Sequence, residues 1–120
     1  CREAVVSDGA IVVLVTAASP EEAETLSRLL LDQRLCACVT ILPQATSLFR
    51  WQGAIDVARE SLLIIKTTLG ALSALTSEIK QHHSYQVPEV IALPIVGGNP
   101  DYLSWLVSET QPEPGRSGAR

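Results

Sequence analysis

The sequence predicts a mixed α/β fold in which helices cover one face of a four-stranded sheet. Short runs rich in β-branched residues alternate with segments whose apolar residues recur at spacings of three and four. Their order is strand, helix, strand, strand, helix, strand, which is the split βαβ pattern, and a third helix follows. The 120 residues, 47% of them hydrophobic, are enough for one domain with a core.

Changes in composition mark the first strand and helix. Residues 11–15, IVVLV, form a continuous apolar run typical of a strand covered on both faces. Ser19 can cap the helix that follows, Pro20 suits its first turn, and Glu22 completes a capping box. Ala23, Leu26, Leu30 and Arg34 follow along this helix at spacings of three and four, so its leucine stripe is expected to pack on the sheet.

The next two strands form a long hairpin. Residues 36–49 are rich in strand formers, and Pro43 within them predicts an edge strand or a bulge. Residues 51–54, WQGA, indicate a turn, after which residues 55–68 return as the second strand. Such a hairpin overhangs a small sheet, and an uncovered strand edge invites pairing with another chain. Oligomerisation is therefore expected.

Two more helices and a strand complete the domain. Residues 70–83 have a helical apolar stripe, and residues 90–96 are apolar like a buried strand. Asn99 and Pro100 begin the third helix, which is expected to turn inward Tyr102, Leu103, Leu106 and Val107, with Trp105 beside them. Residues 1–10 are an N-terminal extension, 11–110 the folded domain, and 111–120, rich in Pro, Gly, Ser and Arg, a mobile tail.

Composition excludes several classes of function. A net charge of −4 argues against a nucleic-acid binder, which usually carries a basic face. No apolar run approaches the roughly 18 residues of a transmembrane helix, so no membrane insertion is expected. Residues 1–10 lack the features of a signal peptide, although the chain does not begin with Met and a leader could have been removed.

The three cysteines cannot all pair within one chain. Cys36 and Cys38 form a C-x-C spacing that matches no standard zinc pattern. We expect them to be buried free thiols rather than metal ligands, which favours a reducing compartment and a cytoplasmic location.

The most promising stretch is 82–89, HHSYQVPE, which holds both histidines, a phenol and a carboxylate where a helix, a loop and a strand meet. Its imidazoles and carboxylate make His82, His83 and Glu89 candidate ligands of a divalent metal ion, copper and zinc above all. Adjacent histidines on a helix point about a hundred degrees apart, so only one could easily join Glu89. The alternative is a structural histidine at a helix C-terminus, where its charge is favoured.

No enzymatic site is indicated. The chain has no G-x-S-x-G and no glycine-rich phosphate loop after its first strand, and adjacency of His83 and Ser84 is not a triad. A turn explains Gly97 and Gly98 better than an anion site. A second hypothesis is a cleft between subunits that binds a small organic or anionic ligand through Trp51, Glu60, Lys66, Tyr85 and Trp105.

Several motifs in order give the chain a recognisable resemblance. It resembles the CutA family of divalent-cation tolerance proteins from about residue 12 to residue 105. The motifs that carry the resemblance are CACV at 36–39, ILP at 41–43, TSLFRWQG at 46–53, IKTT at 65–68, HHSYQVPE at 82–89, LP at 93–94 and DYLSW at 101–105.

The resemblance implies a ferredoxin-like protomer in a homotrimer whose long hairpins cross between subunits. It also implies a role in tolerance of copper and other divalent metals, without an enzymatic reaction. Proposed copper ligands of the family fall on His82 and Glu89, together with a first-strand cysteine that is Val15 here. Ser84 stands where the family usually has proline, and loss of the thiolate weakens a Cu(I) site.

The expected function is therefore that of a trimeric, non-enzymatic protein of divalent metal tolerance that binds copper or another divalent cation weakly, or holds no resident metal. Two alternatives remain. One is a signalling-type trimer with a small molecule in its inter-subunit clefts, and the other is a scaffold that binds a partner protein.

Overall fold

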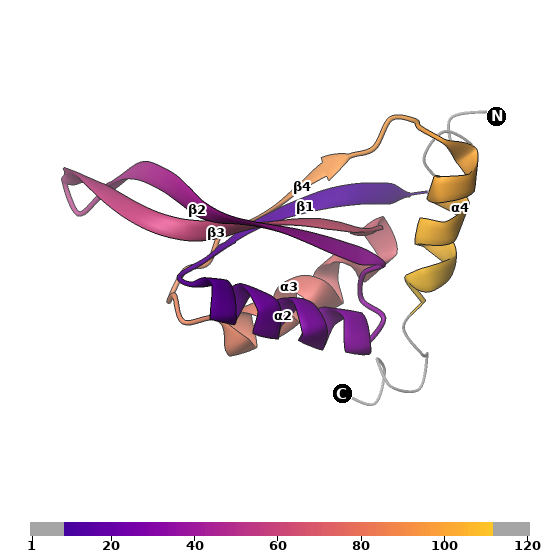
Figure 1. The fold of residues 1–120 in the computed structure, drawn as a ribbon, viewed down its shortest axis with the longest axis horizontal. Helices are drawn as coiled ribbons and strands as arrows, with labels where there is room; N and C mark the ends of the chain where they lie inside the picture. Colours follow the sequence, from indigo (N-terminus) through magenta and orange to yellow (C-terminus); the bar gives the residue numbers. More distant parts are fainter. Residues whose placement is uncertain (1–8, 112–120) are drawn as a thin grey trace.

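The computed structural model describes residues 9–111, which form a single four-stranded antiparallel sheet with helices against it (Figure 1). The strand order is β2-β3-β1-β4. The central strands are β1 (Ala10–Ala17) and β3 (Ala54–Thr68), and the edges are β2 (Cys38–Trp51) and β4 (Val90–Pro94). This is the ferredoxin-like split βαβ topology, so the fold prediction is confirmed. The predicted N-terminal extension and C-terminal tail lie almost wholly outside the described residues.

Helices α2 (Pro20–Asp32) and α3 (Leu72–His82) cover one face of the sheet (Figure 1). As predicted, the Ser19 hydroxyl caps α2 and accepts the Glu22 N–H at 3.1 Å. A short 3-10 turn, η1 (Leu69–Ala71), leads into α3.

Arg34 does not belong to the α2 stripe, contrary to the sequence expectation. The helix ends at Asp32, and Arg34 follows it with a φ of 58° and an exposed side chain. Its guanidinium donates to the carbonyl oxygens of Ser108 and Glu109 at the end of α4 (Pro100–Glu109). A cation at a helix C-terminus is favoured, so Arg34 fastens α4 to the end of α2.

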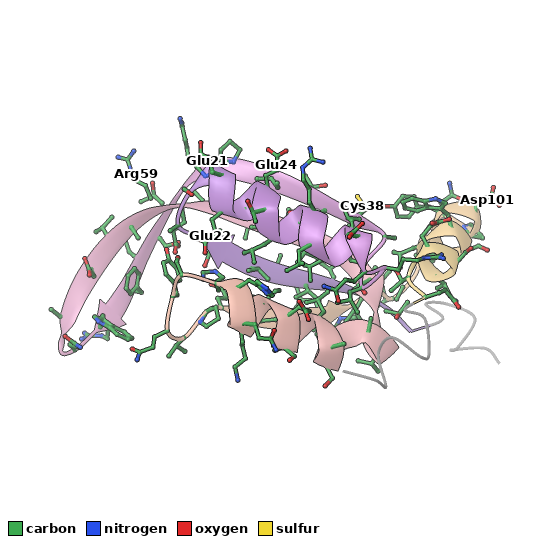
Figure 2. The ribbon with its side chains drawn as sticks, turned by 90° about the horizontal axis from the view of Figure 1, so that it is seen from below. Glu21, Glu22, Glu24, Cys38, Arg59 and Asp101 are labelled. Atoms are coloured by element: carbon green, nitrogen blue, oxygen red, sulfur yellow. The ribbon has the colours of Figure 1, made fainter. Side chains whose placement is uncertain are left out.

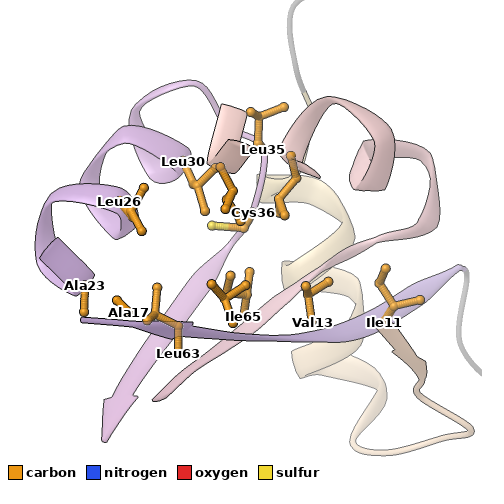
Figure 3. Packing of buried hydrophobic residues seen from close by; sticks show 13 residues of the cluster. Ile11, Val13, Ala17, Ala23, Leu26, Leu30, Leu35, Cys36, Leu63 and Ile65 are labelled. Carbon is orange, nitrogen blue, oxygen red and sulfur yellow. The ribbon is translucent and has the colours of Figure 1, made fainter. Parts of the chain in front are cut away.

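The core lies between the sheet and these two helices (Figure 3). Alternate residues of β1 and β3 face the helices, and each large aliphatic side chain enclosed there contributes about 1.5–3 kcal/mol. The fully enclosed members include Val13, Val15, Leu63, Ile65, Leu26, Leu30, Leu75 and Ile79.

Both described cysteines are free thiols, as expected, but they differ in burial. Cys36 belongs to the core, where burial and the neighbouring Cys38 raise the pKa of its thiol to about 12. Cys38 lies on β2 and is only half-buried.

The β2–β3 hairpin extends past the helices (Figure 1). Its pairing shifts between Leu42 and Ala45, where Pro43 lies, which confirms the predicted bulge. At the tip Gln52 and Gly53 both have positive φ, 51° and 83°, as a two-residue hairpin turn requires.

The face of the sheet opposite the helices is apolar and partly exposed. Helix α4 covers one end of it, at Ala10. We call the rest the helix-free face, and it carries Val12, Leu14, Leu62, Ile64, Ile91 and Leu93. Ile91 and Leu93, on β4, are 50% and 49% exposed.

Helix α4 packs at one end of the sheet, away from α2 and α3 (Figure 1). Leu103 and Leu106 are buried there, as predicted. The expectation that Tyr102 turns inward is wrong, because Tyr102 and Trp105 are 42% and 43% exposed, and their tilted rings pack against each other instead.

Candidate functional site

His83 occupies the junction between α3 and the loop that leads to β4. It is the C-cap of α3, and its imidazole is completely enclosed. Nε2 lies 2.7 Å from the carbonyl oxygen of Thr16, and the backbone N–H of Tyr85 donates to Nδ1 at 3.0 Å. A carbonyl only accepts and an amide N–H only donates, so these two bonds require the tautomer with the proton on Nε2.

Glu22 connects the start of α2 to the same loop (Figure 2). One carboxylate oxygen accepts the Ala18 N–H at 2.9 Å and the Ser84 hydroxyl at 3.0 Å. The other accepts the Ser84 N–H at 2.7 Å and lies 3.7 Å from Nδ1 of His83. Burial raises the pKa of Glu22, but the hydrogen bonds from Ala18 and Ser84 outweigh it, so the pKa lies below its usual value.

Tyr85 connects the loop to the base of the hairpin. Its hydroxyl donates to Glu60, a residue only 8% exposed, at 2.6 Å. Burial first, and then the Glu60 carboxylate, raise the pKa of Tyr85 to about 12. We call Glu22, Glu60, His83, Ser84 and Tyr85 the loop network, because together they join α2, β3 and the loop, with β1 reached through Thr16.

The predicted metal ligands have unequal surroundings. Nδ1 of His82 lies 3.0 Å from the Glu78 carbonyl and so donates to it. In the neutral ring this leaves the Nε2 lone pair available. The His82 side chain is 47% exposed. Glu89 is exposed too, whereas His83 is enclosed. Between residues 9 and 111, no group of three or more His, Cys, Asp or Glu side chains is arranged to hold a metal ion. The three-residue ligand set stays a prediction.

The predicted cleft residues are mostly apart within one protomer. Glu60 and Tyr85 are in contact, but Trp51 ends β2 at the hairpin tip and Trp105 lies on α4. Lys66 donates to the Thr40 hydroxyl at 3.0 Å on the helix-free face. A shared cleft would therefore need a second protomer, and the cleft stays a prediction.

Sequence reasoning missed the role of Glu22 in the loop network, and it missed the Thr16 carbonyl that His83 contacts. The capping-box pattern did single out Glu22, but only as a helix start. Its partner Ser84 lies 62 residues away, a separation at which one sequence offers no signal.

None of the helices in the described part of the chain has the length and hydropathy needed to cross a bilayer.

Comparison with known proteins gives a consistent result. The family model described as CutA1 divalent ion tolerance protein matches residues 11–109. The divalent-cation tolerance protein CutA of Thermus thermophilus is 48% identical over 99 residues, 82% of this chain and 96% of the relative. Protein CutA 1, chloroplastic, of Oryza sativa is 46% identical over 101 residues, 84% of this chain and 57% of the relative.

Solved structures agree in fold. The divalent cation tolerance protein of Thermus thermophilus has a TM-score of 0.84 and 46% identity, covering 85% of this chain and 99% of that one. The periplasmic divalent cation tolerance protein CutA of Archaeoglobus fulgidus has a TM-score of 0.82 and 36% identity, covering 85% and 99%. The family match, residues 11–109, reaches from β1 to α4.

Proposed function

Because the chain belongs to the CutA1 divalent ion tolerance family, we propose that it acts in divalent metal tolerance as a non-enzymatic homotrimer that binds a divalent cation weakly, copper first. The observation that carries the proposal is the 48% identity, over most of both chains, to a relative named for divalent-cation tolerance.

The metal part of the proposal rests on donor atoms that solvent can reach. His82 offers an imidazole nitrogen and Glu89 a carboxylate, and copper and zinc accept both. Two protein ligands leave several positions of such an ion to water or to another protomer. Weak binding follows from this incomplete ligand set, and it suits a protein that buffers a metal ion rather than one that keeps it for catalysis.

The trimer part rests on apolar surface. Ile91 and Leu93 on the helix-free face are about half exposed, and the hairpin exposes further large side chains. Soluble monomers rarely leave contiguous apolar patches of this kind uncovered. The exposed hairpin residues are Leu48, Phe49, Trp51, Ile55 and Val57. Neighbouring protomers that cover this surface would also protect the long β2 edge.

A cytoplasmic location is part of the same proposal, because the free thiols of Cys36 and Cys38 suit a reducing compartment.

A second candidate function is binding of a small molecule between subunits. The contact of buried Glu60 with Tyr85 favours it, since this polar pair lies at the base of a hairpin that would cross to a neighbour.

Titration calorimetry with Cu²⁺ and Zn²⁺ tests the proposal. We expect weak binding that the double variant His82→Ala, Glu89→Ala loses. The control is Glu21→Ala, which removes another exposed carboxylate, on α2, outside the 82–89 stretch. Equal heats in all three proteins would contradict the assigned ligands. Absence of binding at millimolar ion would contradict the metal function itself.

A further inference from the structure

We infer that His83 is a positioning residue, which holds Tyr85 against Glu60 through the hydrogen bonds of its two ring nitrogens, and is not a metal ligand. The inference deepens the proposed function. It rests on that function for one point, namely that His82 and Glu89 are the metal contacts of this stretch. It rests on the geometry of the loop network for everything else.

The ring nitrogens of His83 are both engaged. Coordination needs a nitrogen lone pair, and in the tautomer that the structure requires this lone pair is on Nδ1. There it already accepts the Tyr85 N–H. A cation at Nδ1 would leave that buried backbone donor without its partner, and a cation at Nε2 would displace the proton donated to Thr16.

The surroundings of the ring also oppose a ligand role. The His83 side chain has no exposed surface, and the Tyr85 ring packs against it at a centroid distance of 4.7 Å. His82, one residue earlier, is 47% exposed, and the Glu78 carbonyl engages its Nδ1 rather than its Nε2. An incoming ion therefore meets His82 without rearrangement, but reaches His83 only after the loop opens.

The engaged ring positions Tyr85 from one end while Glu60 holds it at the other. Nδ1 of His83 takes the Tyr85 backbone N–H, and the Glu60 carboxylate takes the hydroxyl at 2.6 Å. Between them, Ser84 is held by its two bonds to Glu22. The direction of the Tyr85 phenol, and with it the hydrogen bond to buried Glu60, therefore depends on His83.

Nitrogen NMR of the imidazoles tests the assignment directly, because the chain has only two histidines. We expect His83 in the Nε2–H tautomer, with ring signals that do not move when Zn²⁺ is added, while those of His82 shift. Saturable shifts of the His83 nitrogens, or an Nδ1–H tautomer, would overturn the inference. If the signals of neither ring move when Zn²⁺ is added and His83 is in the Nε2–H tautomer, the result would count against His82 as a ligand. It would leave the assignment of His83 unchanged.

Variants separate positioning from ligation. His83→Asn keeps an acceptor near Nδ1, His83→Gln keeps a donor near Nε2, and His83→Leu keeps neither. The readout is the NMR signal of the Tyr85 hydroxyl and ring, which only Tyr102 could obscure. We expect this signature to survive in His83→Asn and to be lost in His83→Leu, with Zn²⁺ affinity within about twofold of wild type in each folded variant.

His82→Leu is the matched control. It should lower Zn²⁺ affinity by about tenfold and leave the Tyr85 signature unchanged. A tenfold loss of Zn²⁺ affinity in His83→Asn, with the Tyr85 signature retained, would show ligation and defeat the inference. If His83→Leu does not fold, His83→Asn and the wild-type tautomer still decide the question.

Discussion

Glu22 is a single residue that joins two distant parts of the chain. Its carboxylate takes the Ala18 N–H at the start of α2 and both Ser84 donors, 62 residues later. Three hydrogen-bond donors around one partly buried carboxylate explain why its pKa is lowered despite the desolvation. At the scale of one residue, hydrogen bonds rather than exposure to solvent therefore set the charge state of Glu22.

Ser61 is the buried polar residue that the fold leaves unsatisfied. In the described part of the chain its hydroxyl has no hydrogen-bond partner, and the residue is 1% exposed. We predict that Ser61→Ala is neutral or stabilises the protein by up to about 1 kcal/mol, because an unpaired hydroxyl need no longer be desolvated. Urea unfolding measures the difference.

The matched control is Thr67→Val. The Thr67 hydroxyl is equally buried but donates to the Leu35 carbonyl at 2.7 Å, so its removal should cost about 1–3 kcal/mol. A loss of stability in Ser61→Ala similar to that in Thr67→Val would mean that Ser61 does have a partner in solution.

The buried thiol of Cys36 should lower the free energy of unfolding at alkaline pH. Burial raises the pKa of this thiol to about 12 in the folded protein, above its ordinary value. The stabilisation is therefore fully present below the ordinary thiol pKa and is lost as the pH rises towards 12. We predict that the free energy of unfolding falls more steeply above about pH 9 in wild type than in Cys36→Ala. Parallel curves for the two proteins would refute this.

Among the elements, the hairpin depends most on backbone conformation. The turn at its tip needs positive φ at Gln52 and Gly53, a region that costs a residue with a Cβ about 1 kcal/mol or more. We predict that Gly53→Ala destabilises the protein by about that amount, although no atom lies within 4 Å of the added Cβ. The measurement is the shift of the urea midpoint.

Gly70, in the η1 turn, provides the comparison. A Cβ there also meets open space, but no positive φ is required. Gly70→Ala should be neutral or stabilise by about 0.4–1 kcal/mol, since it restricts the unfolded chain. Equal effects at the two glycines would mean that turn conformation does not control the hairpin.

The two faces of the sheet differ in how far they are covered. Helices α2 and α3 bury one face, while the helix-free face keeps Ile91 and Leu93 about half exposed. We predict that the double variant Ile91→Glu, Leu93→Glu converts the proposed trimer to monomer, because carboxylates cannot be buried in an apolar interface without partners. Sedimentation equilibrium measures the mass.

Ser77→Glu is the control for that experiment, since Ser77 is exposed on α3 on the other side of the sheet. It should leave the mass unchanged. A wild-type protein that is monomeric at tens of micromolar would contradict the trimer.

Much of the fold could be predicted because its signals are local. Ser19 and Asn99 cap helices as their patterns indicate, and Pro43 marks the bulge in β2. The errors arose where tertiary contacts decide the outcome. Tyr102 lies on the exposed side of α4, where its ring packs against that of Trp105, and Arg34 leaves the helical stripe to bind the end of α4. Periodicity does not report either contact.

The sequence by itself determined the order of elements, the capped helices, the hairpin turn and the stretch 82–89 in which the polar groups gather. Each of these depends on neighbours a few residues apart, which propensity and spacing describe. Only the tertiary structure decided that His83 is enclosed while His82 is exposed. Of these two adjacent side chains, it is that of His83 which lies against Thr16 and Glu22. Hydrogen bonds across 62 to 67 residues made that choice.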